Sequence, residues 1–155
     1  MLNLFRFITL FSGCTLMALG GFIYSKNRTS AIHRVFGAYL LFCGLWSFGF
    51  FLTMFQGVPY EFAIWASRVS HFFGGMSAFL FMGFVKEFLK PEIRHRIHPI
   101  HIMLGVGTGF ASLTPWMITS VPTKLFFPYY PEPGPFYPVL LTSFFYTYSI
   151  TFVWH

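Results

Sequence analysis

Residues 35–55 read VFGAYLLFCGLWSFGFFLTMF, and this stretch without a charged side chain decides the fold. At a rise of about 1.5 Å per residue, about 20 helical residues cross the ~30 Å hydrocarbon core of a bilayer. Lipid offers no hydrogen-bond partner to the backbone, so such a stretch is stable there as a helix that satisfies its own N–H and C=O groups. The stretch therefore predicts a transmembrane helix.

Similar apolar stretches fill most of the chain. Only 9% of the residues are charged, against about 25% in soluble domains, and 55% are hydrophobic. This composition excludes a water-soluble globular domain, and the stretches are too long and too uniformly apolar for the alternating strands of a membrane β-barrel. We expect an all-α, polytopic membrane bundle that forms a single membrane-embedded domain over 1–155, with about five transmembrane helices. The predicted spans are 4–24, 35–55, 62–89, 100–121 and 139–155.

Two proline-containing segments shape the second half of the chain. Thr114-Pro115-Trp116 predicts a kink near the outer end of the fourth helix. The many prolines of residues 122–138 exclude a helix and predict a stiff, extended cap at the membrane surface. The last span stops at His155 without a helix-ending pattern. We therefore expect a fragment, or a truncated product, of a larger membrane protein.

The basic residues predict the orientation, because Lys and Arg concentrate in cytoplasmic loops. They cluster in the first and third links, whereas the second link has none and the fourth has only Lys124. We expect the N-terminus outside and anionic lipids as partners of the basic loops, rather than nucleic acid. A cleaved signal peptide at residues 1–24 is the alternative, but its charges would precede the apolar stretch. The clustered residues are Lys26, Arg28, Arg34, Lys86, Lys90, Arg94 and Arg96.

Trp65, Arg68 and His71 are the candidate ligand-binding residues. They are spaced three apart and share one face of the third predicted helix. A charged side chain inside a membrane span is energetically costly, so its presence suggests a functional role. This face of the helix could bind an anionic or carbonyl-bearing ligand. In the alternative interpretation, which we favour, Arg68 extends outward beside Trp65 as an interfacial anchor, and His71 hydrogen-bonds to another helix.

Small residues predict close helix packing. They recur every four residues along the third predicted helix and again in the fourth, where a Gly-x-x-x-Gly pair is weak evidence for a homodimer. The predicted packing residues are Ala66, Ser70, Gly74, Ala78, Gly105 and Gly109.

The sequence contains no pattern that predicts catalysis. There is no Asp, no phosphate-binding glycine loop and no paired set of buried carboxylates. His95, His98 and His101 are spaced three apart, but Pro99 interrupts them, so we expect no metal site and no cofactor. The chain itself is not expected to be an enzyme.

The order of several motifs resembles the N-terminal seven-helix sensory region of bacterial histidine kinases. Pro133-Gly134-Pro135 before an aromatic helix is similar to the extracytoplasmic loop of that family. The motifs in the first half are Val35-Phe36, Leu45-Trp46-Ser47-Phe48-Gly49, Glu61-Phe62-Ala63-x-Trp65-x-x-Arg68, Gly74-Gly75 and the Phe-rich stretch 79–89.

The resemblance implies a sensory input module in a bacterial or archaeal plasma membrane. Such a module passes an extracytoplasmic or intramembrane signal to a cytoplasmic kinase or cyclase domain. This chain lacks the last two spans of that architecture, a phosphoacceptor His-Glu pair and nucleotide-binding motifs, so we expect no kinase activity from it. A fragment of a small-solute transporter or channel, with Arg68 and His71 lining a polar cavity, is the competing interpretation.

Overall fold

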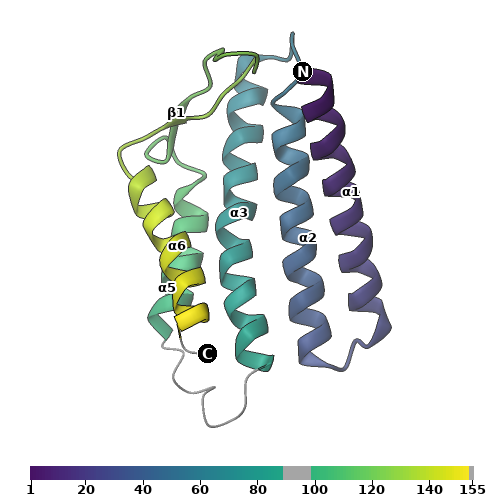
Figure 1. The fold of residues 1–155 in the computed structure, drawn as a ribbon. Helices are drawn as coiled ribbons and strands as arrows, with labels where there is room; N and C mark the ends of the chain where they lie inside the picture. The colour runs from purple at the N-terminus through teal and green to yellow at the C-terminus, as the bar shows by residue number, and fades with distance from the viewer. Residues whose placement is uncertain (89–98, 154–155) are drawn as a thin grey trace.

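The computed structural model describes residues 1–88 and 99–153, which form helices joined at one end by a small β-hairpin (Figure 1). The predicted helical class is therefore confirmed. The elements in chain order are α1 (Leu2–Lys26), α2 (Ala31–Leu52), α3 (Tyr60–Phe88), α5 (Pro99–Ala111), β1 (Ile118–Ser120), β2 (Glu132–Pro133) and α6 (Tyr137–Val153).

Three helices, α1, α2 and α3, are long and apolar enough to cross a membrane. The 13 residues of α5 extend only about 20 Å, and α6 has 17 residues. Membrane character is thus supported for the first half of the chain. The five-span bundle stays a prediction.

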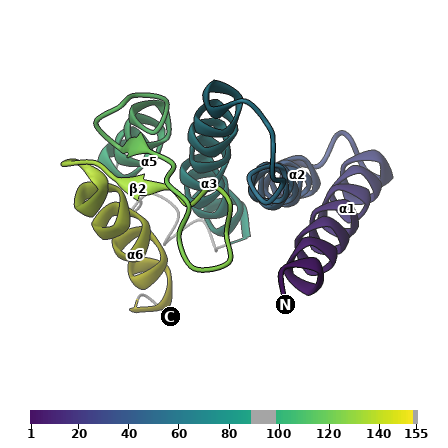
Figure 2. The same cartoon turned by 90° about the horizontal axis from the view of Figure 1, so that it is seen from above.

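The helices stand side by side in a row. Helix α1 packs on α2, α2 packs on α3, and α3 contacts both α5 and α6 (Figure 2). Short links join the first three helices. In the first link, the side-chain oxygen of Asn27 accepts hydrogen bonds from the backbone N–H groups of Thr29 and Ser30, both at 3.2 Å. In the second, Gly57 adopts a left-handed φ of 81°.

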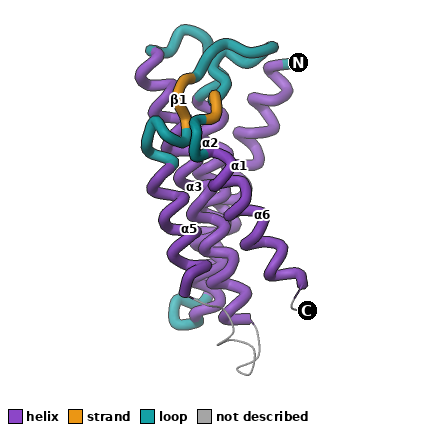
Figure 3. Tube along the Cα trace, turned by 90° about the vertical axis from the view of Figure 1, so that its left-hand side faces the viewer, coloured by secondary structure: helices purple, strands orange, loops and turns teal. Residues whose placement is uncertain are grey.

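The two ends of the bundle differ in content. The N-terminus, the 53–59 link and the β-hairpin lie at one end, which we call the hairpin end (Figures 1 and 3). The first link and the last described turns of α3 and α6 lie at the opposite end, which we call the basic end. Lys26, Arg28, Arg34 and Lys86 are therefore brought to the same end of the bundle.

Helices α1 and α2 meet through glycines. Gly13 faces Gly44, and Gly20 faces Gly37, in an antiparallel arrangement. A Cβ added at Gly20 would lie 2.8 Å from the Gly37 carbonyl oxygen, and one added at Gly37 would lie 2.9 Å from the Gly20 carbonyl oxygen. No side chain fits at such distances, so the two backbones approach each other only because these positions are glycine.

The fourth apolar stretch is not one helix, which corrects the predicted span 100–121 and its kink. Helix α5 ends at Ala111 because Pro115 disfavours helical geometry at Thr114 and supplies no N–H. The last turn tightens, with the N–H of Thr114 bonded to the Ala111 carbonyl at 3.0 Å. Residues 118–120 then form β1 rather than a further helical turn.

The proline-rich segment is folded rather than an extended cap, which is a second correction. β1 pairs with β2 in antiparallel register, Ile118 opposite Pro133. The chain between them reverses at an isolated bridge between Lys124 and Phe127. The N–H of Tyr130 also donates to the Pro122 carbonyl at 2.8 Å. Proline removes donors but leaves carbonyl acceptors, and the non-proline residues between the prolines supply the N–H groups.

The glycine contact between α1 and α2 generates a test with a matched control on the neighbouring residue. We expect Gly20→Ala to lower the free energy of unfolding by about 1–3 kcal/mol, because the methyl group overpacks against the α2 backbone. Gly21→Ala should leave stability unchanged or slightly higher, because nothing lies within 4 Å of its added Cβ and alanine favours the helix. Unfolding in detergent micelles measures both, and equal stability of the two variants would contradict the contact.

Candidate functional site

Arg68 connects α3 to the β-hairpin. Its Nε and Nη2 atoms donate to the Ile118 carbonyl oxygen at 3.3 and 3.1 Å, and only 9% of the residue is exposed. Its guanidinium carbon lies 5.7 Å from the centroid of the Trp65 ring. Within residues 1–88 and 99–153, no acidic side chain pairs with it. The positive charge is therefore balanced by a backbone dipole and an aromatic face.

His71 lies one helical turn further along α3 and is also buried, with 7% exposed. Its Nδ1 atom is 2.8 Å from the Ser67 carbonyl oxygen. A carbonyl can only accept, so Nδ1 carries a proton in this contact. The ring packs between Phe50 of α2, at a centroid distance of 5.4 Å, and Tyr137 of α6, at 6.0 Å.

The three predicted ligand-binding residues are therefore separated by exposure. Arg68 and His71 face the protein interior, whereas Trp65 is 51% exposed. Arg68 does not extend outward as an anchor, because it binds the hairpin, and His71 bonds to its own helix rather than to a neighbour. The exposed anchor and the bond of His71 to another helix are therefore wrong, whereas the predicted position of Arg68 beside Trp65 is confirmed. The ligand-binding role of the three residues stays a prediction.

The predicted packing residues of α3 lie largely toward α2. The Ser70 hydroxyl donates to the Trp46 carbonyl at 2.9 Å, and an added Cβ at Gly74 would lie 3.1 Å from the Trp46 ring. Ala78 is buried, and Ala66 is half-buried. Gly49, which is not among the predicted packing residues, also lies at this interface, because its added Cβ would be 2.6 Å from the Ser70 Cβ.

The Gly-x-x-x-Gly pair of α5 packs within the chain against α3. An added Cβ at Gly105 would lie 2.9 Å from the Phe79 Cβ, and one at Gly109 would lie 3.0 Å from the Met76 side chain. On the α3 side, Gly75 faces the Gly109 backbone. The Gly-x-x-x-Gly pair therefore contacts a neighbouring helix of the same chain.

A small core beneath the hairpin fixes the carbonyl that Arg68 binds. Ile118 and Ala63 are fully buried, and Val121 is nearly so; with Ile64, Met117 and Leu140 they form one cluster. Gly134 closes the hairpin, because any Cβ there would collide with the Trp116 carbonyl. Its N–H donates to the Met117 carbonyl at 2.8 Å.

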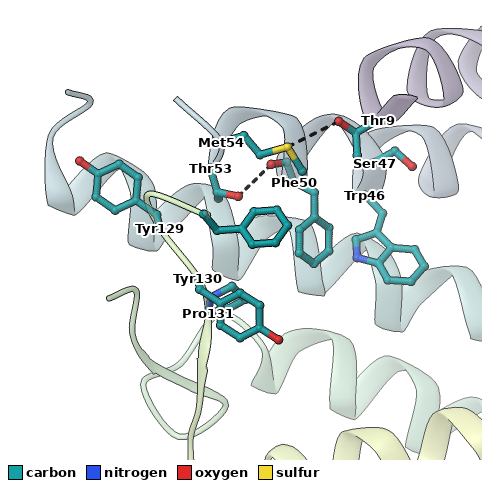
Figure 4. A pocket seen from close by; sticks show the side chains of 10 residues that line it. Thr9, Trp46, Ser47, Phe50, Thr53, Met54, Tyr129, Tyr130 and Pro131 are labelled. Carbon is teal, nitrogen blue, oxygen red and sulfur yellow. Dashed lines mark hydrogen bonds between the residues drawn. The ribbon is translucent and has the colours of Figure 1, made fainter. Parts of the chain in front are cut away.

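A pocket of about 240 Å³ lies at the hairpin end, between α1, α2 and the segment 127–131 (Figure 4). We call it the aromatic pocket. Its lining includes the hydroxyl residues Thr9, Ser47 and Thr53, together with Met54 and Pro131. The sequence did not reveal it, because its two walls are about eighty positions apart in the chain. Its rings belong to Trp46, Phe50, Phe127, Tyr129 and Tyr130.

The pocket is adjacent to the Arg68 and His71 region. Phe50 lines the pocket and also contacts the His71 ring. The Tyr129 hydroxyl donates to the Val58 carbonyl at 2.6 Å, which attaches the loop wall to the α2–α3 link. Phe5 of α1 packs on Phe126 and Phe127, at centroid distances of 5.4 and 5.9 Å. The loop thus bridges α1, the α2–α3 link and, through β1, α3.

The histidines and most basic residues of the third predicted link are not part of the described structure. His95 and His98 lie outside the described residues, as do Lys90, Arg94 and Arg96, and the side chain of His101 is not described. Among the described residues, no group of three His, Cys, Asp or Glu side chains is placed to hold a metal ion.

Comparison with known proteins assigns this chain to no family. No family model, no curated protein and no solved structure matches it. The resemblance to histidine kinase input regions therefore stays a prediction.

The Arg68 contact generates a test of hairpin attachment. We expect Arg68→Met to lower the free energy of local opening by about 2 kcal/mol, because it removes two charge-assisted hydrogen bonds to a buried carbonyl. Amide hydrogen exchange in residues 116–136 should then be about thirty-fold faster. Lys86→Met, which removes a cation near the other end of α3, is the control and should leave that exchange unchanged. Equal protection in Arg68→Met and the native protein would contradict the attachment.

Proposed function

We propose that this chain is the membrane input module of a signal-transduction protein, which passes a stimulus at the hairpin end to an output domain at the basic end. The observation that carries the proposal is the position of the aromatic pocket. One wall belongs to α1 and α2, and the other is a loop that continues directly into β2 and α6. A change in the pocket therefore acts on elements that reach the opposite end.

Two contacts supply a route for that change. Arg68 couples β1 to α3, and Gly134 holds the start of the α6 segment against the Trp116 backbone. A shift of the loop would move both contacts, and α3 and α6 both run to the basic end (Figure 1). Helices in contact through glycine have no interlocked side chains at the contact, which favours two alternative packings of similar energy.

The charge distribution supports the direction of the proposed signal. Lys26, Arg28, Arg34 and Lys86 share the basic end, where the preference of cations for the cytoplasmic face would place them. The output domain would then be cytoplasmic, in agreement with the resemblance to histidine kinase input regions. Anionic lipids are the expected partners of this end.

Three polar side chains of α3 favour a sensor over a transporter. Ser70, His71 and Ser77 each bond to a backbone carbonyl inside the protein. Polar groups used in this way stabilise packing and are not available to line a path for a polar solute.

The reading frame beyond the His155 codon tests the proposal directly. We expect it to encode two further apolar spans followed by a cytoplasmic kinase or cyclase domain, because an input module acts only through an output domain. Sequencing of the coding DNA downstream of that codon provides the measurement. A stop codon immediately after His155, or further spans without any cytoplasmic domain, would overturn the proposal.

A further inference from the structure

We propose that the aromatic pocket binds a small, neutral, planar aromatic molecule with one polar group, of the size of phenol or indole. This inference names the stimulus class of the proposed sensor and in that respect rests on the proposed function. Binding itself depends only on the volume, wall chemistry and charge of the pocket.

The volume sets the size of the ligand. The pocket measures about 240 Å³. An apolar cavity of about 150 Å³ in another protein stays dry and binds benzene. The larger pocket accommodates one ring with a substituent, or two fused rings.

The walls favour a flat ring. Trp46 and Phe50 line the pocket from α2, while Phe127 and Tyr130 line it from the loop (Figure 4). Aromatic groups gain from offset or edge-to-face contact with a ring held between them. A flexible alkyl chain in the same space would lose more conformational entropy for the same contact area.

The surrounding charges exclude a cation as the preferred ligand. No charged residue is among those that line the pocket, and two basic side chains contact its lining residues. Lys124 Nζ lies 5.2 Å from the centroid of the Tyr130 ring. The ring therefore already makes a cation–π contact with a side chain of the protein. Arg6 donates from Nε to the carbonyl of Met54, another lining residue, at 3.1 Å. Two cations at the rim repel a third, so a neutral ligand is favoured over a quaternary ammonium ion.

Hydroxyl groups of the lining supply the polar contact. Thr9 and Thr53 donate to the Phe5 and Phe50 carbonyls, each at 2.8 Å. The Ser47 and Tyr130 hydroxyls make no hydrogen bond within the described parts of the chain, and both residues line the pocket. Either hydroxyl can accept from a ligand N–H or O–H, which matches the single polar group of indole or phenol.

Binding of 5-fluoroindole to the intact chain in lipid nanodiscs tests the inference. We expect broadening of its ¹⁹F resonance beyond that with empty nanodiscs, and displacement by unlabelled indole. Tetramethylammonium and 1-octanol, which represent a cation and an acyl chain, should not displace it. Absence of broadening beyond empty nanodiscs would overturn the inference, and displacement by 1-octanol as effective as that by indole would identify an acyl-chain pocket instead.

Variants locate the binding. Thr9→Phe should fill the pocket and weaken binding about tenfold or more. Val139→Phe, which adds the same ring beside a separate cavity between α5 and α6, is the matched control and should bind as the native chain does. Ser47→Ala, a smaller change that does not depend on accommodation of a new ring, should weaken binding about fivefold by removing one hydrogen bond. Native affinity in both Thr9→Phe and Ser47→Ala would overturn the assignment.

The binding assay separates this inference from the sensor proposal, because it needs no output domain. Binding to the aromatic pocket, without any effect of indole on the output of a longer protein, would contradict the sensor and leave the ligand class intact. If an output domain follows in the reading frame but the aromatic pocket does not bind 5-fluoroindole, the ligand class alone is contradicted.

Discussion

Close backbone approach through glycine is the constraint on which the arrangement of this bundle depends. Three interfaces contain such a contact: Gly20 with Gly37 between α1 and α2, Gly49 with Ser70 between α2 and α3, and Gly75 with Gly109 between α3 and α5. In a membrane, apolar side chains gain little by leaving lipid for a neighbouring helix, so dispersion between close backbones replaces the hydrophobic effect as the source of association. The large apolar side chains exposed on α1 are consistent with this environment.

The row of helices leaves its hairpin end open, and the second half of the chain covers it. Helix α5 ends at Ala111, about one turn before Pro115, and the backbone beyond that proline is free to form β1. Arg68 then binds the Ile118 carbonyl, and the buried cluster around Ile118 shields this contact from solvent. A charge-assisted hydrogen bond in such surroundings is stronger than one in water, so one side chain of α3 orients the hairpin.

The aromatic pocket follows from these two features together. Glycine contacts set the distance between α1 and α2, and the Arg68 contact sets the position of the loop that faces them. Neither feature alone forms the cavity, because its walls come from elements that do not adjoin in sequence. A molecule bound in the pocket would therefore favour one relative position of α1 and α2 with respect to the rest of the bundle.

The sequence by itself determined the helical class and the bounds of the first three helices to within a few residues, and it drew attention to Arg68 as a cation inside a span. Uncharged stretches of spanning length have no other stable form in lipid, and a cation inside such a stretch must find a partner. Only the tertiary structure decided which partner Arg68 has, that the stretch 100–121 divides into a helix and a strand, and that Gly13, Gly20, Gly37 and Gly44 face one another. These outcomes depend on distances between residues far apart in the chain, about which periodicity and composition within one segment carry no information.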